Sequence, residues 1–306
     1  MAEHASFKVQ DLFSVKDKVV LVTGGGSGIG KAIAEGFAVN GAKVYITGRR
    51  KDVLDNAAKE MGENVHTIQG DVQTQDGCVK IADAIKTHES RLDTLVNCAG
   101  VNKLWRARTS DHNDPDQVEN LLTNGVLDFL LTPHSPFRED FNQSNQINVN
   151  GVYFLTVNLL PLLRKAEDPN VCVIASIAAF GTQRTMGSVT YAVSKAAVVH
   201  LAKVLAGRLH PMKIRVNTIC PGVFPSEMTG TTTGKHEYAI SPPAEKAARR
   251  STAGRPGKPE EIVAPVILLS SAGGAYMNGA LLTVDGGRML GTSIHDGIRL
   301  PEDTYD

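Results

Sequence analysis

The sequence predicts an α/β protein built on a doubly wound parallel sheet, and three observations support this fold class. Short apolar runs alternate along the chain with segments whose apolar residues recur at helical spacing. The first run, Val19–Val22, is apolar throughout, as expected of a parallel strand buried on both faces. A glycine-rich turn over residues 23–30 follows it and leads into a helix whose apolar stripe is Ile29, Ile33 and Phe37.

The same alternation continues to the C-terminus, so seven parallel strands with intervening helices are expected. The predicted strands are Val19–Val22, Lys43–Thr47, Val65–Gln69, Thr94–Val96, Val171–Ala175, Ile214–Ile219 and Leu281–Val284. The predicted helices are one from about Gly28 to the Asn40-Gly41 pair, residues 78–88, about Gln143–Lys165, Val189–Leu209 and about Pro259–Ser271. We assign residues 1–306 to a single domain, with a core over 18–290 and a C-terminal tail over 291–306.

Composition argues against several classes of function. The 306 residues include 32 lysines and arginines and 32 aspartates and glutamates, so no net charge attracts nucleic acid or an acidic membrane. No run approaches the ~20 apolar residues of a membrane helix. Residues 1–17 form a lead-in segment to the first strand and do not resemble a secretory signal. We therefore expect a cytoplasmic protein with neither a nucleic-acid nor a membrane partner.

The four cysteines, Cys78, Cys98, Cys172 and Cys220, lie far apart in the sequence. Neither they nor the nine histidines have the spacing of a metal site. Three of the cysteines lie inside strand-like runs, where buried free thiols of a reducing compartment are expected. No metal is therefore predicted.

One segment interrupts the alternation. After Gly100 the chain is much longer than one helix and its loops require, and we assign an insertion to about 103–135. A helix is expected to start near Pro115, since Asp114 is a good N-cap and Gln117 stands three residues after it. Two interpretations stay open: the helix either extends the core or an oligomer contact, or it lines the substrate entrance.

The glycine-rich turn predicts nucleotide binding. Gly24, Gly28 and Gly30 let the backbone approach a ligand closely, and the helix that begins near Gly28 directs free amides at a pyrophosphate. The spacing Gly-x-x-x-Gly-x-Gly is one residue longer than the usual dinucleotide fingerprint. The strand before the turn, and the helix and second strand after it, supply the structural context that this fingerprint requires.

Positive charge follows the second strand. Enzymes that use the nicotinamide cofactor without a 2′-phosphate usually carry an acidic residue there, and this chain has Gly48 instead. The guanidinium of Arg49 could pair with a 2′-phosphate, although a solvated basic turn is the simpler alternative. Ser27, rather than a second basic residue, precedes Gly28, so any discrimination between the two cofactors is expected to be modest.

Four residues are candidates for chemistry. Tyr191 and Lys195 are one helical turn apart, which puts the phenol and the ammonium on one face. A nearby ammonium favours the phenolate and lowers the pKa of the tyrosine toward neutral pH. Ser176 follows the fifth strand, at the sheet edge where ligands bind. Asn148 lies inside a predicted helix, where asparagine has a low propensity. Taken alone, each candidate also fits a structural role. Tyr191 and Lys195 could be surface residues that happen to be close, Ser176 could cap a turn, and Asn148 could bind backbone.

Together these signals resemble the short-chain dehydrogenase/reductase superfamily, over almost the whole chain. The matching motifs are Thr23-Gly24 with Gly28 and Gly30, Asn97-Cys98-Ala99-Gly100, Asn148, Ser176, Tyr191–Lys195, Pro221-Gly222 and Val284–Gly287. Within the superfamily the chain is most similar to 3-oxoacyl reductases, especially the rhamnolipid-pathway kind. That similarity is carried by Pro225–Thr229 and by Gly254–Ile262.

The resemblance implies a Rossmann-type fold and reduction of a ketone by NADP(H), with NAD(H) as the alternative cofactor. Tyr191 would donate the proton, Lys195 would lower its pKa and bind the nicotinamide ribose, Ser176 would hold the carbonyl oxygen, and Asn148 would hold a water. Asp71 and Val72 would flank the adenine. The implied cofactor contacts are Gly24, Ser27, Gly28, Ile29, Gly30, Arg49, Asp71, Val72, Asn97, Ala99, Gly100, Tyr191, Lys195, Pro221, Gly222, Val223 and Ser226. A homo-oligomer, a dimer or a homotetramer, is also implied.

Two features depart from the family pattern. Cys98 replaces the second asparagine of the usual Asn-Asn-Ala-Gly motif, and the insertion is longer than relatives of this length carry. The resemblance therefore transfers the reaction type but not the substrate. Two rival functions remain: an NAD-dependent alcohol dehydrogenase, and a catalytically inactive cofactor-sensing protein.

Overall fold

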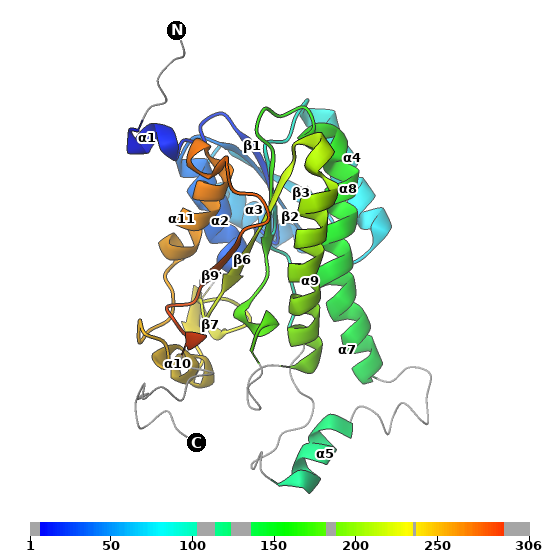
Figure 1. Ribbon diagram of the computed structural model, residues 1–306, viewed down its shortest axis with the longest axis vertical. Helices are drawn as coiled ribbons and strands as arrows, with labels where there is room; N and C mark the ends of the chain where they lie inside the picture. Colours follow the sequence, from blue (N-terminus) through cyan, green and yellow to red (C-terminus); the bar gives the residue numbers. More distant parts are fainter. Residues whose placement is uncertain (1–6, 103–113, 124–135, 182–187, 235–236, 291–306) are drawn as a thin grey trace.

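The computed structural model describes residues 7–102, 114–123, 136–181, 188–234 and 237–290. Its centre is a seven-stranded parallel sheet with the strand order β3-β2-β1-β4-β5-β6-β9 (Figure 1). The strands are β1 (Val19–Thr23), β2 (Lys43–Gly48), β3 (Val65–Gln69), β4 (Thr94–Asn97), β5 (Asn170–Ile174), β6 (Arg215–Pro221) and β9 (Leu281–Val284). Each predicted strand is present, and the predicted fold class is confirmed.

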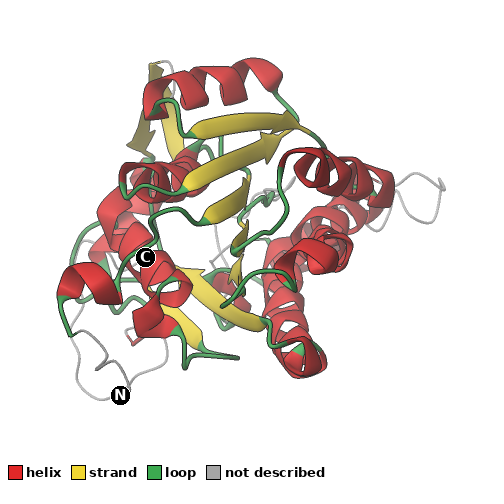
Figure 2. Ribbon diagram, turned by 90° about the horizontal axis from the view of Figure 1, so that it is seen from above, coloured by secondary structure: helices red, strands yellow, loops and turns green. Residues whose placement is uncertain are grey.

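Helices cover both faces of the sheet (Figure 2). On one face lie α2 (Gly28–Val39), α3 (Lys51–Met61) and α11 (Pro259–Ser270), and on the other α4 (Gln75–His88), α8 (Gly151–Leu163) and α9 (Val189–Arg208). The alternating side chains of β1 divide between the two cores: Val19 and Leu21 join the α4–α8–α9 cluster, whereas Val20 and Val22 join the α2–α3–α11 cluster. Burial on both sides explains why this strand is apolar throughout.

The helix predicted over residues 143–165 has three parts. An α-helix, α7 (Pro136–Asn145), continues into a π-helical turn, η1 (Gln146–Asn150), and then into α8. Single π-turns inside α-helices are frequent at functional sites. Asn148 lies at the middle of this turn and is buried.

The expectation that no segment approaches a membrane span was wrong for one helix. The 20-residue helix α9 is long and apolar enough by composition to cross a membrane. Its burial explains this composition, since Val198, Ala202 and Leu205 belong to the core cluster between α9 and the sheet. The described structure therefore accounts for α9 as a core helix.

Several helices and strands were not predicted from the sequence. They are α1 (Val9–Leu12), α3, the antiparallel hairpin of β7 (Gly230–Gly234) and β8 (Glu237–Ile240), and α10 (Pro242–Arg249). Helix α3 buries only Leu54 and Ala57, so its apolar stripe is too narrow to stand out. The strand β7 has the sequence Gly-Thr-Thr-Thr-Gly, which has no apolar alternation at all.

The helix predicted inside the insertion is α5 (Pro115–Thr123). Both Asp116 and Gln117 donate backbone N–H groups to Oδ1 of Asp114, at 2.9 and 3.2 Å, which confirms the predicted cap. Among the residues of α5 whose side chains the structure describes, none lines the cavity described below, so its proposed place at the substrate entrance stays a prediction. The rest of the insertion and the tail over 291–306 lie outside the described residues, and the single-domain assignment also stays a prediction.

Candidate active site

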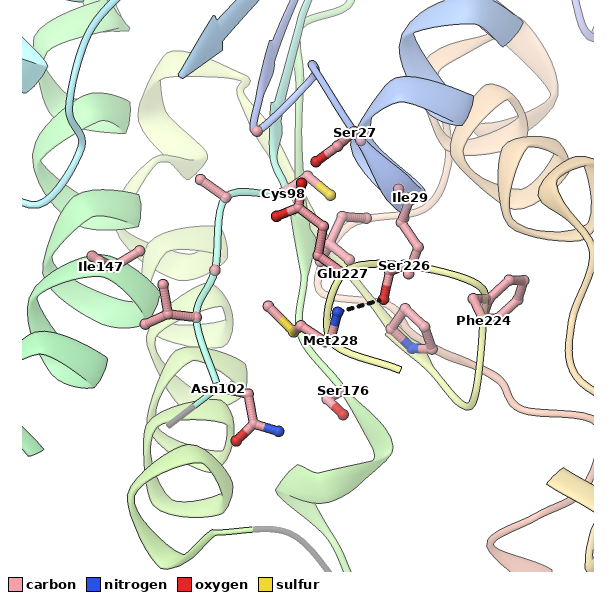
Figure 3. Close-up of a pocket in the computed structure, with 18 of the residues that line it drawn as sticks. Ser27, Ile29, Cys98, Asn102, Ile147, Ser176, Phe224, Ser226, Glu227 and Met228 are labelled. Atoms are coloured by element: carbon pink, nitrogen blue, oxygen red, sulfur yellow. Dashed lines mark hydrogen bonds between the residues drawn. The ribbon is translucent and has the colours of Figure 1, made fainter. Parts of the chain in front are cut away.

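A cavity of about 450 Å³ opens where the parallel strands end. Its walls come from the segments that follow β1, β2, β3, β4, β5 and β6, and from the first turns of α2 and α9. Figure 3 shows lining residues from the segments after β1, β4, β5 and β6. In open α/β sheets this edge is where ligands bind, because loops diverge there to opposite faces of the sheet.

The glycine-rich turn forms one wall of the cavity. Gly24 and Gly28 have φ angles of +67° and +52°, a region that side chains disfavour. A Cβ atom on Gly24 would lie 3.0 Å from the Cα of Ala99, and one on Gly30 would lie 2.3 Å from the carbonyl oxygen of Gly24. Ser27 is the N-cap residue of α2, but its side chain makes no capping hydrogen bond to the helix. The first amides of α2 thus remain available to an anion, and the turn fits the pyrophosphate of a dinucleotide.

Replacing Gly30 with alanine should disrupt this turn. The added methyl group would collide with backbone rather than with a flexible side chain, so we expect Gly30→Ala to destabilise the fold by about 1–3 kcal/mol. Gly207 of α9 is the matched control, because nothing lies within 4 Å of its Cβ position. Gly207→Ala should be neutral or stabilising by up to about 1 kcal/mol. Urea unfolding of both variants measures the difference, and equal stabilities would contradict the steric argument.

The end of β4 is fixed against the turn by one hydroxyl group. Oγ1 of Thr23 accepts hydrogen bonds from the backbone N–H groups of Cys98 and Ala99, both at 2.9 Å. Asn97, a predicted cofactor contact, does not line the cavity. It is buried, and its Nδ2 donates to Oγ1 of Thr156 at 3.3 Å, which ties β4 to α8. Its position supports a structural role, and the predicted direct contact has no support in the geometry.

Tyr191 lies in the first turn of α9, which Ser188 caps. The Tyr191 N–H donates to Oγ of Ser188 at 3.3 Å. One turn later, Nζ of Lys195 lies 5.6 Å from the centre of the Tyr191 ring and donates to the carbonyl oxygen of Ile174 at 3.0 Å. The predicted shared helix face is confirmed, since both residues line the cavity.

The electrostatics of this pair differ from the sequence-based expectation. Burial raises the pKa of Tyr191, with the Ser176 hydrogen bond acting in the opposite direction, so the predicted lowering was wrong. Burial also lowers the pKa of Lys195 to about 8. At neutral pH the tyrosine therefore keeps its proton and the lysine remains mostly an ammonium. A neutral phenol beside a cation is suited to donate a proton.

Ser176 and Asn148 approach this pair from two other elements. Ser176 follows β5, lines the cavity and is the hydrogen-bond partner of Tyr191. Asn148 does not line the cavity; its Oδ1 accepts from the N–H of Val101 at 2.9 Å, and its Nδ2 donates to Oγ of Ser194 at 2.9 Å. It remains close to the lysine, because a Cβ atom on Gly100 would lie 3.3 Å from Oδ1 of Asn148 and 3.4 Å from Nζ of Lys195.

Most of the predicted cofactor contacts meet in this cavity. Those that line it are Gly24, Ser27, Gly28, Ile29, Gly30, Arg49, Asp71, Val72, Ala99, Gly100, Tyr191, Lys195, Pro221, Gly222, Val223 and Ser226. Arg49 is exposed at the end of β2, and Nε2 of Gln69 donates to its carbonyl oxygen at 2.9 Å. Glu227 was not predicted as a site residue, and its Oε1 lies 2.6 Å from Nη2 of Arg50. No local pattern pairs two residues so far apart in the chain.

Comparisons with known proteins agree with this geometry. A family model described as short chain dehydrogenase matches residues 18–237. The short-chain dehydrogenase/reductase PhomF of Diaporthe leptostromiformis is 35% identical, over 91% of this chain and 94% of the relative. The rhamnolipids biosynthesis 3-oxoacyl-[acyl-carrier-protein] reductase of Pseudomonas aeruginosa is 34% identical, over 90% and 97%. A solved RhlG/NADP active-site complex from Pseudomonas aeruginosa is 33% identical with a TM-score of 0.74, covering 91% of this chain and 98% of that one.

Proposed function

This chain belongs to the short-chain dehydrogenase/reductase family and is an oxidoreductase, and we propose that it interconverts a ketone and a secondary alcohol with NADP(H). One observation carries the proposal. Ser176, Tyr191 and Lys195 come from two separate elements and line one cavity together with the glycine-rich turn. Reduction of a ketone needs a proton donor beside a cofactor site, and this arrangement supplies it.

Each side chain has a role in the proposed reduction. The cofactor supplies the hydride when it is bound. Ser176 donates a hydrogen bond to the substrate carbonyl oxygen and orients it toward Tyr191, whose Oη gives up the proton as charge develops on that oxygen. Lys195 binds the cofactor ribose through its ammonium and stabilises the tyrosinate that remains. Asn148 positions the segment that carries Val101, and the water predicted at Asn148 would use the acceptor capacity that remains on Oδ1.

The proposal extends to the assembly and location of the enzyme. Large apolar side chains stay exposed on two neighbouring helices, with Tyr153 of α8 at 43% and Val193 and Val204 of α9 at 49% and 44%. An apolar surface of this kind supports association of like subunits, as a dimer or a tetramer. We place the enzyme in the cytoplasm, with a small-molecule ketone or alcohol as its partner.

Arg49 provides the test of cofactor preference. A charge-assisted contact between its guanidinium and the 2′-phosphate of NADP(H) strengthens binding by about tenfold at an exposed site. We expect Arg49→Ala to weaken NADPH binding by about that factor and to leave NADH binding nearly unchanged. Titration of both cofactors against both proteins measures it. Equal losses of affinity for the two cofactors would show that Arg49 does not recognise the 2′-phosphate.

A further inference from the structure

The carboxylate of Glu227 lies inside the cofactor cavity and is held there by donors from three other segments. Nη2 of Arg50 donates to its Oε1 at 2.6 Å, and Oη of Tyr238 donates to the same oxygen at 3.0 Å. The hydroxyl group of Ser27 is a third hydrogen-bond partner. Figure 3 shows Glu227 directed toward Ser27 of the glycine-rich turn. Burial favours the neutral acid, but these hydrogen bonds, Arg50 foremost, hold the pKa of Glu227 below its ordinary value, so the group is charged at neutral pH.

Two of these donors, Ser27 and Arg50, line the cavity proposed to hold the cofactor, whereas Tyr238 reaches Glu227 from β8. Ser27 is the N-cap of α2, and Arg50 follows Arg49 at the end of β2, where the adenosine ribose binds in folds of this class. The segment that carries Glu227 packs directly on the turn, since a Cβ atom on Gly28 would lie only 3.1 Å from Cβ of Ser226. A negative charge is therefore built into the region where a 2′-phosphate would bind.

The end of β2 has no acidic side chain of its own, because Gly48 occupies the usual position. Glu227 lies 177 residues after Arg50 in the sequence, but its carboxylate lies beside Arg50 in the folded chain and provides the acidic group. A carboxylate in that place has two effects on a 2′-phosphate. It engages the guanidinium and hydroxyl groups that could otherwise donate to the phosphate, and it repels the phosphate charge. A ribose 2′-hydroxyl carries no charge for the carboxylate to repel, and it can donate a hydrogen bond to the carboxylate.

We infer that Glu227 is a specificity-determining residue that weakens binding of the 2′-phosphorylated cofactor by competing for Arg50 and Ser27. The inference rests on the proposed nicotinamide-cofactor function of this cavity, but not on which cofactor the wild-type protein prefers. The ion pair between Glu227 and Arg50 is not expected to contribute much to the stability of the fold. The side chains of Glu227 and Arg50 are 45% and 56% exposed, and ion pairs exposed to this extent contribute little to folding.

Calorimetric titration of NADPH and NADH against the wild type, Glu227→Gln and Arg50→Gln/Glu227→Gln tests this inference. We expect Glu227→Gln to tighten NADPH binding by about two- to fivefold and to change NADH binding by less. The double variant should lose most of the gain, because it has no guanidinium to release, and should keep only the part that comes from removing the repulsion between carboxylate and phosphate. Tyr238→Phe is the matched control: it removes one hydrogen bond but leaves the carboxylate, so the ratio of the two affinities should stay as in the wild type.

An unchanged or weaker affinity for NADPH in Glu227→Gln would overturn the inference, as would an equal gain for both cofactors. Glu227→Ala, which removes the carboxylate without an amide in its place, must shift the ratio of affinities in the same direction. The wild-type titration separately tests the proposed function. If the wild type binds NADH better than NADPH, the proposed cofactor is wrong, yet a shift of the ratio toward NADPH in Glu227→Gln still supports the inference.

Discussion

Replacing Tyr191 with phenylalanine is expected to lower kcat by about a hundredfold to ten-thousandfold, the range that a positioned general acid contributes. The substitution keeps the ring against Lys195 and removes only the hydroxyl group that Ser176 contacts. Cofactor affinity should therefore stay near the wild-type value. Steady-state kinetics with a ketone, together with a cofactor titration of the same protein, measures both quantities.

Tyr45→Phe is the control for that experiment. Tyr45 lies in β2 outside the cavity, and its hydroxyl group donates to Oε1 of Glu89 at 2.7 Å. Loss of this hydroxyl group should leave kcat unchanged. A Tyr191→Phe enzyme that kept more than about a tenth of the wild-type kcat would exclude Tyr191 as the proton donor.

Lys195→Ala should weaken cofactor binding and also lower kcat, because one ammonium group serves both steps. Its position supports this double role: Nζ is buried, lies near the Tyr191 ring and is anchored on the carbonyl oxygen of Ile174. We expect a loss of at least about tenfold in cofactor affinity and about a hundredfold in kcat. Lys203→Ala, at an exposed position of the same helix, should change neither quantity.

The pH dependence of cofactor binding provides a second readout for Lys195. Its lowered pKa of about 8 means that the ammonium is lost as the pH rises through that value. Cofactor affinity in the wild type should therefore fall above about pH 8, and Lys195→Ala should lack this fall. An affinity for cofactor unchanged by the mutation would contradict the assigned ribose contact.

The features that depend on residues close together in the chain could be predicted from the sequence. Val19–Val22 and the glycines after it are contiguous, and the four-residue step from Tyr191 to Lys195 is fixed by helix geometry, so each could be located without a structure. The strand ends then converge by topology, which brings Ser176 to the same cavity.

Other features depend on contacts between distant segments. The π-turn that contains Asn148 has no sequence signature, and the side chain of Asn148 makes hydrogen bonds to Val101 and Ser194. The effect of burial on the pKa of Tyr191 depends on how the completed fold excludes water. The position of Glu227 beside Arg50 depends on how the segment after β6 folds over the turn.

The measurement that tests the central claim most directly is the catalytic efficiency of the wild-type enzyme on a panel of ketones, followed through the absorbance of reduced nicotinamide. The panel should include 3-oxoacyl thioesters and cyclic ketones, each with NADPH and with NADH. We predict turnover of at least one ketone, with a higher kcat/KM for NADPH than for NADH. Binding of NADPH without turnover of any ketone would contradict the proposed reaction, and equal efficiencies with the two cofactors would contradict the proposed preference.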